Sequence, residues 1–122
     1  MNLETIFSAT VTNGGISIDR YGDTLDQSVG YVVSHVGNEI KIPASQFTYE
    51  TFVDVLFEQA NTLKSCSEYY GSFVGFWYDS ESATWYSDIS QVVGDLEIAK
   101  RLGKSRKQLA IFDLGSKSAI SL

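Results

Sequence analysis

The residues that could do chemistry are few and far apart in the sequence. The chain has one histidine, His35, and one cysteine, Cys66. A general base needs an acid partner or a nucleophile beside it, and a nucleophilic thiol needs a base, but no local spacing supplies either. One histidine and one cysteine also fall short of the four ligands of a typical zinc site. We therefore interpret His35 as a structural or surface residue and Cys66 as a semi-buried small apolar residue.

Two aspartates, Asp88 and Asp113, fall in segments whose composition predicts strands. If those strands are neighbours, the two carboxylates could face each other, and with Asp79 they could hold a hard cation for a metal-dependent hydrolase. We favour the alternative, in which these acids face water or cap turns. The sequence also lacks the glycine-rich phosphate-binding, zinc-protease and nucleophile-elbow motifs. We predict no enzyme activity, no metal and no cofactor.

Charge is sorted along the chain. Residues 1–99 carry fourteen acids and three bases, a net of −11, whereas residues 100–122 carry six bases and one acid, a net of +5. Such asymmetry bears on partners rather than on fold. The isoelectric point near 4.6 disfavours binding of nucleic acid over the whole surface. It suits a basic partner, such as a protein that handles nucleic acid.

The acidic half of the chain contains the first candidate binding surface. A helix predicted from Thr48 to Leu63 places apolar residues at three- and four-residue spacing on one face and acids on the other. Two further acids lie in a predicted hairpin loop, and a run of aromatic rings flanks that loop. Exposed tryptophans often anchor protein interfaces. The predicted partner-binding residues are Glu50, Asp54, Glu58, Asp79, Glu81, Trp77 and Trp85.

The basic segment is the alternative binding surface. Five cations lie within eight residues, namely Lys100, Arg101, Lys104, Arg106 and Lys107. They could contact phosphates in a nucleic-acid-binding accessory protein, although no aromatic ring interleaves them to stack on bases. We favour the simpler interpretation, a solvated helix end. A homodimer that pairs the acidic face of one copy with the basic segment of another is a further alternative.

The bulk properties favour one soluble domain. A chain of 122 residues with 43% hydrophobic residues can bury a single core. A lone cysteine fits a reducing compartment. No apolar run approaches the roughly eighteen residues of a membrane span, and the N-terminus does not resemble a secretion signal. We predict a single domain over residues 1–122, located in the cytoplasm of a bacterial host cell, with no membrane partner.

The elements that must position these residues are mostly hairpins. The predicted order is ββββαββαββ, an α+β fold with a mostly antiparallel sheet and two helices. Turn signals at Asn13-Gly14-Gly15 and Gly37-Asn38 join the first two pairs of strands. The predicted strands are residues 5–11, 16–18, 31–36, 39–42, 72–78, 84–89, 108–114 and 118–122. The second helix is expected to begin near Asp95 and to end at Gly103.

Two short blocks in the C-terminal third carry a resemblance. Trp85 to Ser90 reads W-x-x-D-x-S, and Gln108 to Asp113 reads Q-x-A-I-x-D. This pair of blocks, spread over residues 72–114, resembles a pattern in small uncharacterised phage and plasmid proteins. The resemblance implies an origin in a mobile element, structural roles for Asp88, Gln108 and Asp113, and no catalytic residue. Together with the acidity, it favours a non-catalytic binding protein encoded by a phage or another mobile element. Such a protein would use its acidic surface to inhibit a host nucleic-acid-handling or defence protein, in the manner of anti-CRISPR or anti-restriction proteins.

Overall fold

A computed structural model describes residues 2–25, 29–69 and 71–122 of the chain. These residues form three α-helices and seven strands, and every strand pairing recorded between them is antiparallel. The predicted α+β class is therefore confirmed. The chain divides into two compact units, residues 1–25 with 38–89 and residues 26–37 with 90–122. We call them the first unit and the second unit.

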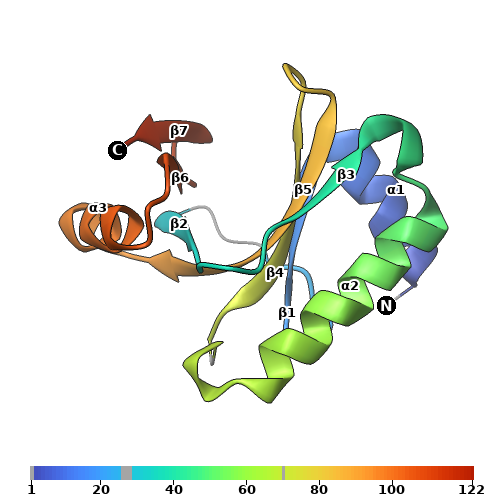
Figure 1. Ribbon diagram of the computed structural model, residues 1–122, viewed down its shortest axis with the longest axis horizontal. Coiled ribbons are helices and arrows are strands. Elements are labelled where there is room, and N and C mark those ends of the chain that lie inside the picture. The colour runs from blue at the N-terminus through green and yellow to red at the C-terminus, as the bar shows by residue number, and fades with distance from the viewer. Residues whose placement is uncertain (1, 26–28, 70) are drawn as a thin grey trace. The chain divides into compact units, whose positions relative to one another are not determined.

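The first unit packs two helices on one face of a sheet (Figure 1). Its helices are α1 (Leu3–Asn13) and α2 (Tyr49–Ser65), and its strands are β1 (Gly15–Asp19), β3 (Ile40–Pro43), β4 (Phe73–Asp79) and the first part of β5 (Thr84–Val93). Strand β4 lies between β1 and β5, and β3 pairs with β5. Short 3-10 helices span Ala44–Gln46 and Ser67–Tyr69.

The core of the first unit lies between these helices and the sheet. Phe52 of α2 is fully buried, and its ring centroid lies 4.7 Å from that of Phe76 on β4. Residues alternate between the two faces of a strand, so Val74 and Phe76 face the helices while Gly75 and Trp77 face the other way. The remaining buried apolar residues of this core are Ile6, Ile18, Ile42, Val55, Leu56, Leu63, Val74, Trp85 and Ile89.

The second unit has one helix on its sheet. It comprises β2 (Tyr31–Ser34), the last part of β5, α3 (Leu96–Ser105), β6 (Ala110–Asp113) and β7 (Ser118–Ser121). Strand β2 lies between β5 and β6, and β7 pairs with β6. Val33, Ala99 and Ile111 form the buried centre, and the surrounding apolar residues include Leu102 and Leu122.

The first predicted strand is wrong, because residues 5–11 lie in helix α1. The Asn2 side chain caps this helix by accepting from the backbone amide of Glu4 at 2.8 Å, and Gly14 ends it with φ of +75°. The many β-branched residues favour a strand by local propensity. Burial of Ile6 and Thr10, four residues apart on one helix face, overrides that preference.

The second predicted hairpin is also wrong, because β2 and β3 do not pair with each other. Both pair with the ten-residue strand β5, β2 at Ser90–Val93 and β3 at Thr84–Ser87. A strand of this length has room for two short partners in succession. The local turn signal at Gly37 could not reveal this, since the competing partner is distant in sequence.

The remaining elements follow the prediction, apart from the ends of β5 and α3. Strand β5 continues to Val93, four residues beyond the predicted end at Ile89. The long helix begins after Thr48, whose hydroxyl accepts from the backbone amide of Thr51 at 3.2 Å. Helix α3 continues to Ser105 instead of stopping at Gly103. A Cβ atom at Gly103 would lie 2.5 Å from Cδ1 of Leu122, so glycine serves here for close packing.

Candidate functional site

The acidic residues predicted on α2 share one exposed face. Glu50, Asp54 and Glu58 are spaced four residues apart and all are exposed. The opposite side of the helix is fixed by buried residues, among them Gln59, whose amide donates to the carbonyl of Asn38 at 2.7 Å. The structure therefore brings the three predicted acids together, and we call them the acidic stripe.

An exposed phenylalanine accompanies the acidic stripe. Phe57 follows Asp54 by three residues, precedes Glu58, and is 56% exposed. The sequence prediction missed this residue, although it is an apolar side chain on the polar side of the helix period, which is the signal that marks it. A large ring exposed among carboxylates is typical of an interface anchor.

The hairpin acids Asp79 and Glu81 differ in their hydrogen bonding. The Asp79 carboxylate accepts from the Ser82 hydroxyl at 2.7 Å and from the backbone amide of Glu81 at 3.3 Å, so it shapes the β4–β5 turn. The Glu81 side chain is exposed. Of the two, Glu81 is the side chain that the turn presents to solvent.

The two predicted tryptophan anchors also differ, and Trp85 is a correction. Trp85 is only 6% exposed and stacks on Phe47 with a centroid separation of 4.2 Å, inside the core of the first unit. It cannot contact a partner from there. Trp77 is 43% exposed and projects from the opposite face of the sheet.

Trp77 belongs to an aromatic surface on the helix-free face of the first unit. Its ring stacks on that of Tyr86, with centroids 4.3 Å apart and an interplanar angle of 10°. Its indole N–H donates to Oδ2 of Asp88 at 3.3 Å, and Asp88 is buried. The ammonium group of Lys41 lies 5.8 Å from the centre of the Tyr86 ring. We call these four residues the Trp77 surface.

The basic residues lie on and just after α3 in the second unit. Arg101, Lys104 and Lys107 are exposed and Lys100 is half-buried. Arg106 is held within the second unit by hydrogen bonds. Its guanidinium donates to Oε1 of Gln91 at 2.7 Å and to the carbonyl of Ser34 at 3.4 Å. Burial lowers the pKa of Arg106 below its ordinary value.

Replacing Arg106 with alanine is expected to destabilise the protein. The change leaves Gln91 and the Ser34 carbonyl without this donor, so we expect the free energy of unfolding to fall by about 1.5–3 kcal/mol. Arg101→Ala, at an exposed position of the same segment, is the matched control and should change it by less than about 0.5 kcal/mol. Urea unfolding measures both. Equal losses would contradict a structural role for Arg106.

Sorting the charges by structural unit keeps the sign of the asymmetry seen in the sequence but reduces its size. The first unit carries eleven acids and three bases, a net of −8, and the second carries six bases and four acids, a net of +2. The acidic stripe and the Trp77 surface both belong to the first unit. A cation approaching either surface is attracted by the charge of the unit that bears it.

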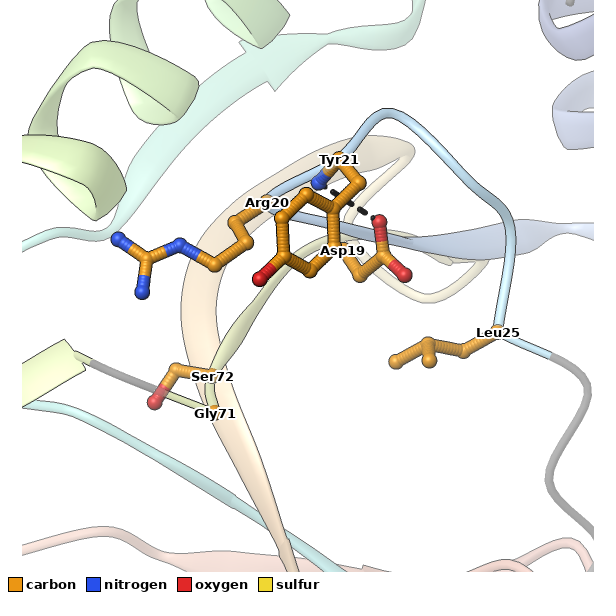
Figure 2. Close-up of a pocket in the computed structure, with 6 residues that line it drawn as sticks. All are labelled: Asp19, Arg20, Tyr21, Leu25, Gly71 and Ser72. Carbon is orange, nitrogen blue, oxygen red and sulfur yellow. Dashed lines mark hydrogen bonds between the residues drawn. The ribbon is translucent and has the colours of Figure 1, made fainter.

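A pocket of about 220 Å³ lies in the first unit, where β1 ends near the start of β4. Figure 2 shows its lining, with the Asp19 carboxylate accepting from the backbone amide of Tyr21. That bond is 2.8 Å long, and the same oxygen accepts from the amide of Asp23 at 3.0 Å. Asp19 therefore organises its own loop, and we assign it a structural role. The other lining residues are Arg20, Leu25, Gly71 and Ser72.

The hydrolase alternative requires Asp88 and Asp113 to lie on neighbouring strands. Strand β2 separates β5 from β6 in the sheet, so this condition fails. Asp113 instead caps the β6–β7 turn, accepting from the backbone amide of Gly115 at 2.9 Å and from the Ser116 hydroxyl at 3.0 Å. Within residues 2–25, 29–69 and 71–122, no group of three or more histidine, cysteine or acidic side chains could hold a metal ion.

Comparison with known proteins adds no relative. No protein family, curated protein or solved structure matches the chain. In the part of the chain that the structure describes, no helix has both the length and the apolar character needed to cross a membrane.

Proposed function

We propose that this chain is a non-catalytic binding protein that engages a basic protein through the acidic stripe of α2. The observation that carries the proposal is the exposure of Glu50, Asp54 and Glu58 on one helix face, with the Phe57 ring among them. The carboxylates steer a cationic partner over distances of about a Debye length, and the ring adds apolar contact once the two surfaces meet.

The biological role that fits such a surface is inhibition of a host protein that handles nucleic acid. Carboxylates spaced along a helix can take the place of backbone phosphates in a cationic groove. An anti-CRISPR or anti-restriction inhibitor encoded by a phage or another mobile element would use this chemistry. The structural support is the net charge of −8 on the first unit. The mobile-element origin is an expectation from the sequence pattern of residues 72–114 alone.

Direct nucleic-acid binding by the second unit is the alternative. Arg101, Lys104 and Lys107 are exposed and could contact phosphates. Their number is smaller than the sequence suggested, because Arg106 is held by Gln91 and Ser34. Salt-dependent binding of an oligonucleotide to the purified protein is the result that would favour this function.

Reversing the charge of the acidic stripe tests the proposed function. The double variant Asp54→Lys and Glu58→Lys should lower the rate constant for association with the basic partner about tenfold at low ionic strength, because electrostatic steering is removed. It should also weaken the salt dependence of that rate. Stopped-flow or surface-based kinetics against the captured partner measures both effects.

The matched control reverses two exposed acids elsewhere in the first unit. Asp23→Lys and Glu68→Lys change the net charge by the same amount and leave the acidic stripe intact. We expect this control to retain most of the association rate. Unchanged binding of the Asp54 and Glu58 variant would rule out the acidic stripe as the contact surface.

A further inference from the structure

The Trp77 surface is built as a row across four strands of the first unit. Gly15 of β1 is the pairing partner of Trp77 on β4, and Lys41 of β3 is the pairing partner of Tyr86 on β5. Paired residues of neighbouring strands lie on the same face of a sheet. The stacked Trp77 and Tyr86 rings therefore stand between a cation on one side and a glycine on the other.

Glycine at position 15 leaves the outer face of the Trp77 ring uncovered. A Cβ atom at Gly15 would lie 2.8 Å from the backbone oxygen of Phe76, so the strand tolerates no side chain there. Gly75, two residues before Trp77 on the same face, is equally constrained, since its Cβ would lie 2.8 Å from Oδ1 of Asp88. On the side away from Tyr86, the strand neighbour of Trp77 is therefore the bare backbone of Gly15.

A carboxylate lies at the edge of this uncovered ring. Asp88 is 7% exposed, and the Trp77 indole N–H donates to its Oδ2 at 3.3 Å while its Oδ1 lies over Gly75. The hydrogen bond to Asp88 therefore fixes the orientation of the exposed indole.

The chain already places a cation on this surface. The Lys41 ammonium lies 5.8 Å from the Tyr86 centroid, within the range of a cation–π interaction, on the side of Tyr86 opposite Trp77. The outer face of Trp77 is the equivalent position at the other end of the stack. A planar cation bound there would extend the row by one member.

We propose that the outer face of Trp77 binds the guanidinium group of an arginine side chain on a basic protein partner. A guanidinium is planar and delocalised, so it stacks flat on an indole ring and gains both cation–π and stacking contact. A lysine ammonium interacts with the indole ring only as a point charge. A nucleobase would also stack, but the net charge of −8 on this unit repels the phosphates that accompany it.

This inference rests on the proposed function only for the class of partner, because the two surfaces lie on opposite sides of the sheet in the first unit. The probe is a short, end-blocked peptide of alternating arginine and glycine, with the matching lysine peptide for comparison. Isothermal titration calorimetry measures both affinities at low ionic strength. We expect the wild-type protein to bind the arginine peptide about fivefold more tightly or better.

Two variants define the result. Trp77→Leu, at a partly exposed position, should reduce the ratio of the two affinities to about one, because lysine and arginine then differ little. The Asp54→Lys and Glu58→Lys variant should keep the preference for arginine even where it loses the protein partner. The proposed function can therefore fail without affecting this measurement, and the reverse also holds.

Three outcomes would overturn the arginine site. They are equal affinities of the two peptides for the wild-type protein, a preference for arginine that survives Trp77→Leu, and binding of a single-stranded thymidine oligonucleotide that Trp77→Leu abolishes. The last would assign the ring to nucleobases.

Discussion

Replacing Phe52 with alanine should lower the free energy of unfolding by about 3–5 kcal/mol, the largest effect that we expect from a single substitution. Phe52 is fully buried, and its ring contacts three other rings, those of Phe7, Phe47 and Phe76, at centroid separations of 5.5, 6.0 and 4.7 Å. Truncation removes the transfer free energy of the ring and leaves a cavity between α1, α2 and the sheet. Urea unfolding followed by circular dichroism measures the loss.

Phe57 of the same helix is the matched control for Phe52. It is 56% exposed, so Phe57→Ala should change the free energy of unfolding by less than about 0.5 kcal/mol. The same substitution should weaken binding to the basic partner if Phe57 anchors the interface. A loss of stability as large as that of Phe52→Ala would contradict the orientation of α2 and, with it, the acidic stripe.

Replacing Gly30 with alanine should destabilise the protein by about 2–4 kcal/mol. Gly30 has φ of +115°, a conformation that residues with a Cβ rarely adopt, and it precedes β2 in the second unit. The added Cβ would also lie 2.6 Å from Cγ1 of Val92 on the neighbouring strand. Backbone strain and overpacking act together at this position, and urea unfolding measures their combined cost.

Gly94→Ala is the control for Gly30→Ala. An added Cβ at Gly94 meets nothing within 4 Å, and its φ lies outside the left-handed region. Its substitution should leave the free energy of unfolding unchanged or raise it slightly, because alanine restricts the unfolded chain. A Gly30 variant as stable as the Gly94 variant would contradict the backbone geometry at the start of β2.

The sequence predicted the elements whose signals are local. The apolar period after Thr48 predicts α2, and the residues that follow Asp95 predict α3. The structure confirms both helices. The acidic stripe followed from the same period, because residues on the polar side of an amphipathic helix must share a face. The same reasoning predicts that Phe57 is exposed, because it too lies on the polar side of the helix, but our sequence analysis did not include it.

The features that the sequence did not predict depend on contacts between residues that are distant in the sequence. Residues 5–11 carry strand propensity but form α1, where Ile6 joins the buried core of the first unit. Strands β2 and β3 each pair with β5, a choice that no local turn signal encodes. The Trp77 surface depends on the register of four strands, which places Gly15 beside Trp77 and Lys41 beside Tyr86. Trp85 stacks on Phe47, a residue that is distant in the sequence, and no local pattern predicts this contact.

The most direct test of the proposed function is an affinity capture from bacterial lysate with three forms of the tagged protein. These are the wild type, the Asp54→Lys and Glu58→Lys variant, and the Asp23→Lys and Glu68→Lys control, each washed at low and at high salt and analysed by mass spectrometry. We predict that one nucleic-acid-handling protein is retained by the wild type and the control, is eluted by salt, and is lost from the acidic-stripe variant. Equal retention by all three forms, or an empty capture with the protein itself dimeric, would contradict the proposal.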